Sequence, residues 1–174
     1  GTTYQYGLLV NSSGYVQITG SGATFLTSTE VVNDGNWHYI AGTISGTNGQ
    51  IYIDGALSVE GTVDALTSQA VDVVLGGRGD GAGGYTSYFN GIIDSPRIFS
   101  RVLSASEILS NYQAGNIEFQ YRVSTDNSTW SDWTSYNDGS LIFDGTDDYV
   151  DIGATPTTGT GSFTLEAWIK TTIS

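Results

Sequence analysis

The residues of this chain best suited to bind a ligand are closely spaced carboxylates. One short stretch contains four of them, Asp144, Asp147, Asp148 and Asp151. Hard divalent cations such as Ca²⁺ are bound by about six to eight oxygen atoms, which carboxylates and backbone carbonyls supply. Asp94 is a further carboxylate, and on the residues alone it can pair with Arg97 or cap a turn. The alternative for the stretch 144–151 is an acidic surface that is simply hydrated.

Side chains suited to catalysis are scarce. His38 is the single histidine, and the chain has no cysteine. His38 directly follows Trp37 in a predicted strand, so we assign it a structural role and expect neither a Ser/His/Asp set nor a His- or Cys-rich metal site. Glycoside hydrolysis requires a pair of carboxylates, whereas the stretches around Glu118 and Glu166 supply only one each. We therefore predict that the chain is not an enzyme.

Aromatic side chains offer a second kind of binding surface, because sugars stack on rings that stand beside polar groups. The candidates are Tyr85, Tyr88, Trp130, Trp133 and Tyr136. The alternative is that the two tryptophans and Tyr136 cover a sheet or a contact between subunits. The sequence therefore leaves glycan binding and ordinary packing both open.

Composition excludes two classes of partner. Eighteen carboxylates face five basic residues, which gives a formal net charge of −13. Phosphate contacts need clustered Lys and Arg, so we expect no nucleic-acid partner. No apolar run approaches the length that crosses a bilayer, so we expect no membrane insertion. Without cysteine there is no disulfide framework, and the fold must rely on its core and on any bound metal.

Short segments rich in Val, Ile, Thr and Tyr, separated by turn residues, predict an all-β sandwich. Asp54-Gly55 is a strong signal for a tight hairpin turn, and the Gly-rich stretch 76–84 predicts a loop. The predicted strands are Tyr4–Val10, Tyr15–Thr19, Trp37–Ile44, Gln50–Ile53, Ala56–Glu60, Val71–Leu75 and Tyr88–Phe99.

One helix is predicted over Ser104–Tyr112. Ser104 followed by Glu107 fits a capping box, and Gly115 follows where a helix would stop. The residues spaced to form one apolar stripe against a sheet are Ala105, Ile108, Leu109 and Tyr112. In the next stretch, 116–138, Phe119, Tyr121 and Val123 alternate with polar residues, which predicts a hairpin or a small added ribbon.

Three stretches together resemble the laminin G-like domain of the concanavalin A-like superfamily. They are Asp34–Tyr39, a turn followed by a strand with a buried Trp; Gly91–Ile98 with the helix Leu103–Tyr112; and Phe143–Val150 with Phe163–Lys170. The resemblance implies a jelly-roll β-sandwich of two antiparallel sheets with one short helix and an added β-hairpin. This superfamily includes lectins, adhesion modules and accessory domains of enzymes, so its fold does not define a function.

The resemblance also implies a metal. In similar sandwiches an acidic residue at the position of Asp94 often helps to hold a structural calcium near the opening strand. A jelly roll that closes normally would bring the carboxylates of 144–151 near Asp94. The implied cofactor is therefore Ca²⁺, with Asp94, Asp144 and Asp148 as its ligands.

The family segments occur in a rotated order. Residues 1–112 resemble the middle and C-terminal part of the sandwich, 113–140 form an inserted ribbon or linker, and 141–174 resemble the N-terminal strands of a sandwich, their own or a neighbour's. Joining Ser174 to Gly1 produces a continuous family sequence. This order indicates a circular permutant or one period of a tandem array.

The rotated segment is expected to complete the core. Its apolar residues are Leu141, Phe143, Val150, Ile152, Phe163, Leu165 and Ile169, and they would contribute roughly 10–20 kcal/mol before entropy. Without them, residues 1–112 would expose a groove and unpaired strand edges. The chain can close on itself, or the segment can complete the next copy by strand addition, which builds a fibre.

We expect from these features a non-catalytic extracellular or cell-surface module for structure or adhesion. It would be a repeat or subunit of an adhesin or filament, assembled head to tail by strand complementation, with neighbouring copies of itself as partners. The alternative is a self-contained, lectin-like module that binds glycans.

Overall fold

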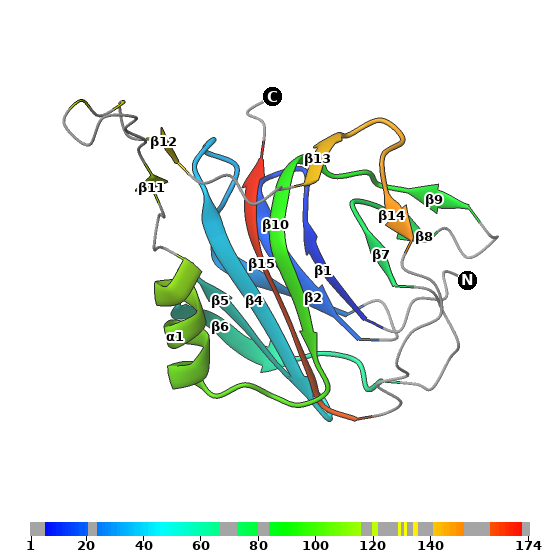
Figure 1. Ribbon diagram of the computed structural model, residues 1–174. Helices are drawn as coiled ribbons and strands as arrows, with labels where there is room; N and C mark the ends of the chain where they lie inside the picture. Colours follow the sequence, from blue (N-terminus) through cyan, green and yellow to red (C-terminus); the bar gives the residue numbers. More distant parts are fainter. Residues whose placement is uncertain are drawn as a thin grey trace.

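The fold is described from a computed structural model of the chain (Figure 1). The described residues are 6–20, 24–66, 73–79, 84–115, 120–121, 129, 131, 134–135, 141–151 and 161–171. The predicted all-β class is confirmed, because antiparallel strands dominate these residues and a single helix accompanies them.

The larger sheet has six antiparallel strands in the order β13-β10-β15-β4-β5-β6. They span Leu141–Asp144 (β13), Asn90–Phe99 (β10), Phe163–Thr171 (β15), His38–Ser45 (β4), Asn48–Ile53 (β5) and Ala56–Thr62 (β6). The β5–β6 hairpin turns through Asp54-Gly55 as predicted, and both residues have positive φ values of 50° and 78°. This backbone conformation is that of the tight turns that match the twist of a hairpin.

The smaller sheet has three strands, β1 (Gly7–Val10), β2 (Tyr15–Thr19) and β3 (Phe25–Val31), in sequence order. The predicted hairpin over β1 and β2 is confirmed. Asn11 closes its turn, because the Asn11 side-chain oxygen accepts hydrogen bonds from the backbone N–H groups of Ser13 at 2.9 Å and Tyr15 at 3.1 Å. Such local bonds are why Asn favours turns.

β15 occupies a central place in the larger sheet although it comes from the far end of the chain (Figure 1). It pairs with β4 from Phe163↔Ile44 to Ile169↔His38. Its other edge pairs with β10, where a bulge interrupts the register between Asp94 and Arg97. β13 comes from the same end of the chain and, among the described strands of the larger sheet, pairs with β10 alone. In this structure β13 and β15 therefore share one sandwich with the strands of residues 7–99.

The two sheets enclose the main core. Its buried members from the smaller sheet are Val16 and Ile18, and those from the larger sheet are Ile40, Ile44, Ile51, Ile53, Ile93, Phe143, Phe163 and Ile169. Phe163 is fully buried and Tyr6 packs on it, with 4.4 Å between the ring centroids. Val150 and Leu165 pack against this core while partly buried. These placements are as predicted.

The helix α1 (Ala105–Gly115) covers the outer face of the larger sheet. The predicted capping box is present, since the Ser104 N–H donates to the Glu107 carboxylate at 2.8 Å and the Glu107 N–H donates to Ser104 Oγ at 3.3 Å. These bonds satisfy donors that a helix start leaves free. Ile108 is fully buried and joins a second core with Tyr39, Tyr52 and Leu103.

Short strand pairs complete the fold. They are β7 (Val74–Leu75) with β14 (Val150–Asp151), β8 (Arg78–Gly79) with β9 (Tyr85–Thr86), and β11 (Gln120–Tyr121) with β12 (Thr134–Ser135). The β11–β12 pair agrees with the predicted ribbon between helix and β13. No helix in the described part of the chain is long and apolar enough to cross a bilayer.

Four predicted burials are wrong. Leu141 is 37% exposed, because it begins an edge strand with one neighbour. Trp37 is 40% exposed and lies just before β4 begins. Leu109 is 41% exposed and Ala105 is exposed, so α1 contacts the sheet through a narrower stripe than predicted. Ile152 lies outside the described residues.

Candidate functional site

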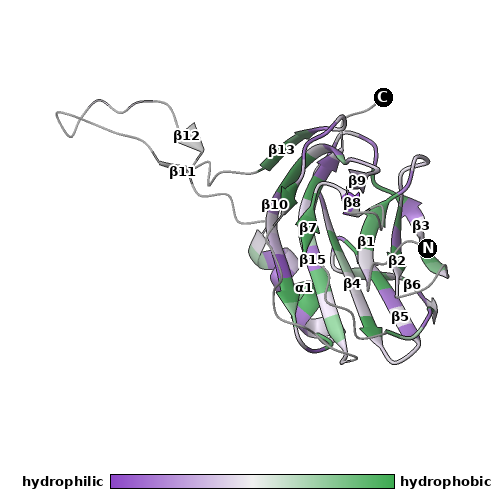
Figure 2. Ribbon diagram, turned by 90° about the vertical axis from the view of Figure 1, so that its right-hand side faces the viewer, coloured by the Kyte–Doolittle hydropathy of each residue, from purple (hydrophilic) through white to green (hydrophobic). Residues whose placement is uncertain are grey.

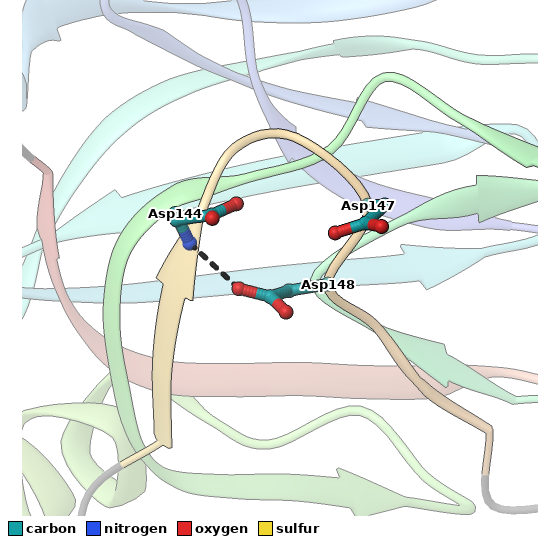
Figure 3. Close-up of side chains that lie close together, drawn as sticks. All are labelled: Asp144, Asp147 and Asp148. Carbon is teal, nitrogen blue, oxygen red and sulfur yellow. Dashed lines mark hydrogen bonds between the residues drawn. The ribbon is translucent and has the colours of Figure 1, made fainter.

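Three acidic side chains meet in the loop that joins β13 to β14, which we call the acidic loop (Asp144–Asp148). Carboxylate oxygens of Asp144, Asp147 and Asp148 lie within 4.8 Å of one another at the surface (Figure 3). Gly145 makes the loop possible: it has φ of 82°, and a Cβ there would stand 2.6 Å from the Cβ of Asn90. A side chain at this position would be strained and would clash.

Backbone hydrogen bonds hold two of these carboxylates. The Asp144 N–H donates to Asp148 Oδ2 at 2.9 Å (Figure 3), and the Thr146 N–H donates to Asp144 Oδ1 at 2.8 Å. Three carboxylates so close together repel one another unless a cation neutralises them. They are also the oxygen ligands that Ca²⁺ prefers, so the donor set fits the predicted metal.

Asp94 does not join the acidic loop. Asp144 pairs with Asn90 on β10, and Asp94 lies four residues further along the same strand, opposite Trp168. At about 3.3 Å per residue this separates them by roughly 13 Å. The Asp94 carboxylate accepts a hydrogen bond from Ser95 Oγ at 3.2 Å instead. The structure therefore brings together Asp144 and Asp148 from the predicted ligand set, adds Asp147, and leaves Asp94 apart. The Asp151 side chain lies outside the described part.

Beside this loop three tyrosines form what we call the tyrosine cluster (Tyr85, Tyr88 and Tyr149). The rings of Tyr85 and Tyr149 lie 4.1 Å apart between centroids with a tilt of 33°, and Tyr149 is 43% exposed. The Tyr88 hydroxyl donates to the backbone carbonyl of Tyr85 at 2.9 Å. Two of the predicted aromatic residues are thus neighbours here, while Trp130, Trp133 and Tyr136 lie outside the described residues.

A fourth carboxylate, Glu166, is buried on the face of the larger sheet that α1 covers. Glu166 is 3% exposed and stands on the outer face of β15. Its oxygens accept hydrogen bonds from the Tyr39 hydroxyl on β4, from Asn111 Nδ2 on α1 at 3.1 and 3.2 Å, and from Arg97 Nη1 on β10 at 3.3 Å. We call these contacts the Glu166 network. Burial, and then the hydrogen bond to the Glu166 carboxylate, raise the pKa of Tyr39.

The sequence prediction missed the Glu166 network and considered Glu166 only as a catalytic candidate. The available signal was a single Glu in the strand Phe163–Thr171, whose other residues are mostly apolar or Thr. A charge inside such a strand is costly unless partners satisfy it. Because three elements already donate to this carboxylate, its geometry is that of a structural acceptor.

His38 has the predicted structural role. His38 Nδ1 lies 2.9 Å from Asp54 Oδ2, and Nε2 lies 3.0 Å from Asp34 Oδ1. Burial lowers the pKa of His38, but the hydrogen bonds and charges of Asp54 and Asp34 outweigh burial and raise it above 6.5. Hydrogen bonds from Asn36, and then the bond to His38, lower the pKa of Asp34 to about 2. The contacts of His38 with Asp34 and Asp54 connect the loop before β4 to the β5–β6 turn.

Comparison with known proteins establishes the family. A laminin G family model, described as the concanavalin A-like lectin/glucanases superfamily, matches residues 1–109. The chain belongs to this family, which confirms the predicted resemblance and fits a lectin-like or adhesion module. Laminin G-like domains are generally extracellular. No curated protein and no solved structure matches the chain. Residues 141–171 lie beyond the matched range.

Proposed function

We propose that this chain is a non-catalytic, extracellular module for structure or adhesion, acting as a repeat or subunit of a cell-surface adhesin or filament. Copies join head to tail when β13 and β15 of one copy complete the sandwich of the next. The partners are thus neighbouring copies of the chain. The observation that supports this proposal is the central place of a strand from the far end of the chain, between β4 and β10.

The sandwich depends on this strand. Removing β15 would leave β4 and β10 each with one unpaired edge and would take Phe163 and Ile169 from the main core. Each large apolar side chain contributes about 1.5–3 kcal/mol, while a whole domain is stable by only about 5–15 kcal/mol. A chain whose own β15 is engaged elsewhere must therefore obtain a β15 from another copy.

The connection between α1 and β13 is long enough for β15 to come either from the same chain or from another copy. Twenty-five residues, 116–140, separate Gly115 from Leu141. Fully extended, they reach about 90 Å, which is longer than the sandwich needs for closure on itself and long enough to reach a neighbour. The contacts of β15 involve only the side chains and backbone of residues 161–171, so a second copy can supply them equally well.

The acidic loop completes the proposal with a metal. Asp144, Asp147 and Asp148 would hold Ca²⁺, which would fix the loop between β13 and β14 on the completed sandwich. An acidic surface with a net charge of −13 suits a soluble extracellular repeat. Strand exchange and metal binding would then concern the same terminal segment, 141–171.

A cysteine pair tests strand exchange. Ser162 Oγ lies 3.1 Å from Ser45 Oγ, across the paired ends of β15 and β4, which suits a disulfide after both are replaced by Cys. We mix the Ser45→Cys chain with the Ser162→Cys chain under mild oxidation. Strand exchange predicts disulfide-linked dimers of one chain of each kind, and larger species when one chain carries both replacements.

The matched control pairs Ser45→Cys with Ser110→Cys, because Ser110 is exposed on α1 and cannot meet position 45 through strand exchange. A monomer in dilute solution with a cooperative melt, together with no cross-linked dimer above this control, would refute the proposal. In that case the chain carrying both replacements would form only an internal disulfide.

Glycan binding is the second candidate function, and the tyrosine cluster favours it. Tyr85 and Tyr149 present neighbouring rings beside the carboxylates of the acidic loop, which is the combination of stacking face and polar groups that sugars use. A glycan array of the parent chain would be compared with Tyr149→Ala, with Trp130→Ala/Trp133→Ala, and with Leu57→Ala, which removes an exposed apolar side chain on β6. Binding lost only in the aromatic variants supports this function, and no binding at all removes it.

A further inference from the structure

β15 carries two buried polar side chains on its outer face, two residues apart. Thr164 is fully buried and Glu166 is 3% exposed. We call them the register pair. Every side-chain hydrogen bond found for the register pair is made with residues between 39 and 111, so one part of the chain binds the polar groups of the other.

Thr164 bonds to the segment that leads into α1. Its Oγ1 accepts from the Leu103 N–H at 2.9 Å and donates to the Arg101 carbonyl at 2.9 Å. Two residues further along β15, Glu166 accepts from Tyr39, Asn111 and Arg97. The two positions therefore have different requirements: the first needs a hydroxyl that both donates and accepts, and the second needs an acceptor with several lone pairs.

The apolar face of β15 cannot fix its register alone. Phe163, Leu165, Ala167 and Ile169 all point toward the main core. A shift by one residue exposes this whole face, but a shift by two residues replaces one apolar side chain with another. Such a shift would place Glu166 against the Arg101 carbonyl or in the position of Trp168, and would leave the Tyr39 hydroxyl without its acceptor.

We propose that the register pair is the recognition determinant of the completing strand. The groove between β4 and β10, with α1 above it, accepts a β15 segment in one register, because only this register gives a carboxylate to Tyr39 and Asn111 and a hydroxyl to Leu103. The partner it selects is a strand from this chain or a second copy with the pattern Thr-X-Glu on its outer face. The second-copy case rests on the function proposed above.

The test uses the 45–162 disulfide as a register reporter in the full chain. Ser45→Cys and Ser162→Cys are combined in one chain, and the disulfide is equilibrated against glutathione. The effective concentration of the disulfide is quantified by mass spectrometry of digests, and internal and interchain products are added together. This sum reports how often β15 is in the native register, whichever copy supplies it. The division between internal and interchain products reports strand exchange separately.

Glu166→Leu removes the acceptor and keeps an apolar side chain of similar size. We expect the effective concentration of the 45–162 disulfide to fall roughly tenfold, because Tyr39 and Asn111 lose their acceptor in the native register and other registers then compete. Glu166→Gln keeps one acceptor oxygen, so the effective concentration of the disulfide should fall less in this variant. The matched control is Tyr52→Phe, which removes a buried hydroxyl on β5 that donates to Gln50 and does not pair with β15, and this variant should match the parent.

If Glu166→Leu does not fold, Asn111→Leu removes the donor from the groove and leaves β15 unchanged. It should lower the effective concentration in the same direction by a smaller factor, because one of three partners is lost. Effective concentrations for Glu166→Leu, or in its place Asn111→Leu, equal to those of the parent would overturn the proposal. If Glu166→Leu lowers the effective concentration but only the internal disulfide forms, strand exchange is overturned. The role of the register pair as the determinant of register is then still supported.

Discussion

The two main strands contributed by the far end of the chain are held very differently. β15 lies between two strands, buries Phe163 and Ile169 in the main core and is bonded through Glu166 to three other elements. β13 lies at the edge of the sheet with one neighbour, and its Ile142 is 75% exposed. Figure 2 colours most of β13 as hydrophobic although it stands at the edge.

This difference indicates that β13 and β15 have separate roles. β15 supplies stability and specific recognition, because its side chains are buried on both faces. β13 supplies position, because its pairing with β10 carries the acidic loop to the surface beside the tyrosine cluster. Changes in β15 should therefore affect folding and assembly, whereas changes around β13 should affect ligand binding.

The largest contrast is expected between Phe163→Ala and Ile142→Ala. Phe163 is fully buried, and truncating a core Phe costs about 3–5 kcal/mol of unfolding free energy. Ile142 is mostly exposed, so its truncation should change stability by at most about 0.5 kcal/mol. Urea denaturation of both variants measures the difference. Equal losses would mean that β15 does not occupy the central position described.

The second contrast compares buried and exposed carboxylates. Glu166→Gln should lower the unfolding free energy by about 1–3 kcal/mol, because the amide gives its donors one fewer acceptor and leaves its own N–H groups poorly matched. Asp147→Asn, in the acidic loop, should change it by at most about 0.5 kcal/mol in the absence of divalent cations. Denaturation in chelator-treated buffer measures both. A larger loss of unfolding free energy for Asp147→Asn than for Glu166→Gln would contradict the roles given above to β13 and β15.

Added Ca²⁺ should separate the same two variants in the opposite order, with Asp147→Asn the more strongly affected. If the acidic loop binds Ca²⁺, a tenfold excess over Kd stabilises the folded chain by about 1.4 kcal/mol. Asp147→Asn should lose this gain, whereas Glu166→Gln should keep it. Thermal melts with added Ca²⁺ and with chelator give the measurement. An unchanged melting temperature in the parent chain after chelation would remove the metal from the proposal.

Local signals in the sequence predicted local structure well. Asp54-Gly55, the Ser104/Glu107 capping box and the turn at Asn11 each depend on neighbouring residues, and all three form as predicted. β3 was not predicted, because the polar run Thr27–Glu30 hides its alternation. The two Phe residues of the far segment were placed in the core correctly, since large apolar residues in a strand pattern have few other places to go.

Long-range geometry was not predictable in the same way. The separation of Asp94 from the acidic loop depends on the register between β10 and β13, which no local pattern encodes. The exposure of Leu141 depends on β13 being an edge strand. The Glu166 network joins residues 39, 97, 111 and 166, and its existence could be inferred only from a charge that needs partners inside a strand.

The smallest expected effect concerns pH and the beginning of β4, where His38 pairs with Ile169 of β15. The folded-state pKa of His38 lies above 6.5, because the bonds to Asp54 and Asp34 outweigh burial. The folded chain therefore binds this proton more tightly than the unfolded chain does. The stabilisation from His38 is fully present below pH 6.5 and is lost as pH rises through the folded-state pKa.

His38→Gln removes the charge and keeps hydrogen-bonding capacity, so the comparison isolates the titration. The difference in melting temperature between parent and variant should be largest near pH 5.5 and should shrink by pH 9, because Asp34, with its pKa of about 2, stays ionised across this range. The partly exposed setting keeps this effect small. If the difference grew toward pH 9, the neutral imidazole would be the stabilising form, and the charge of His38 would not be what holds the loop before β4 to the β5–β6 turn.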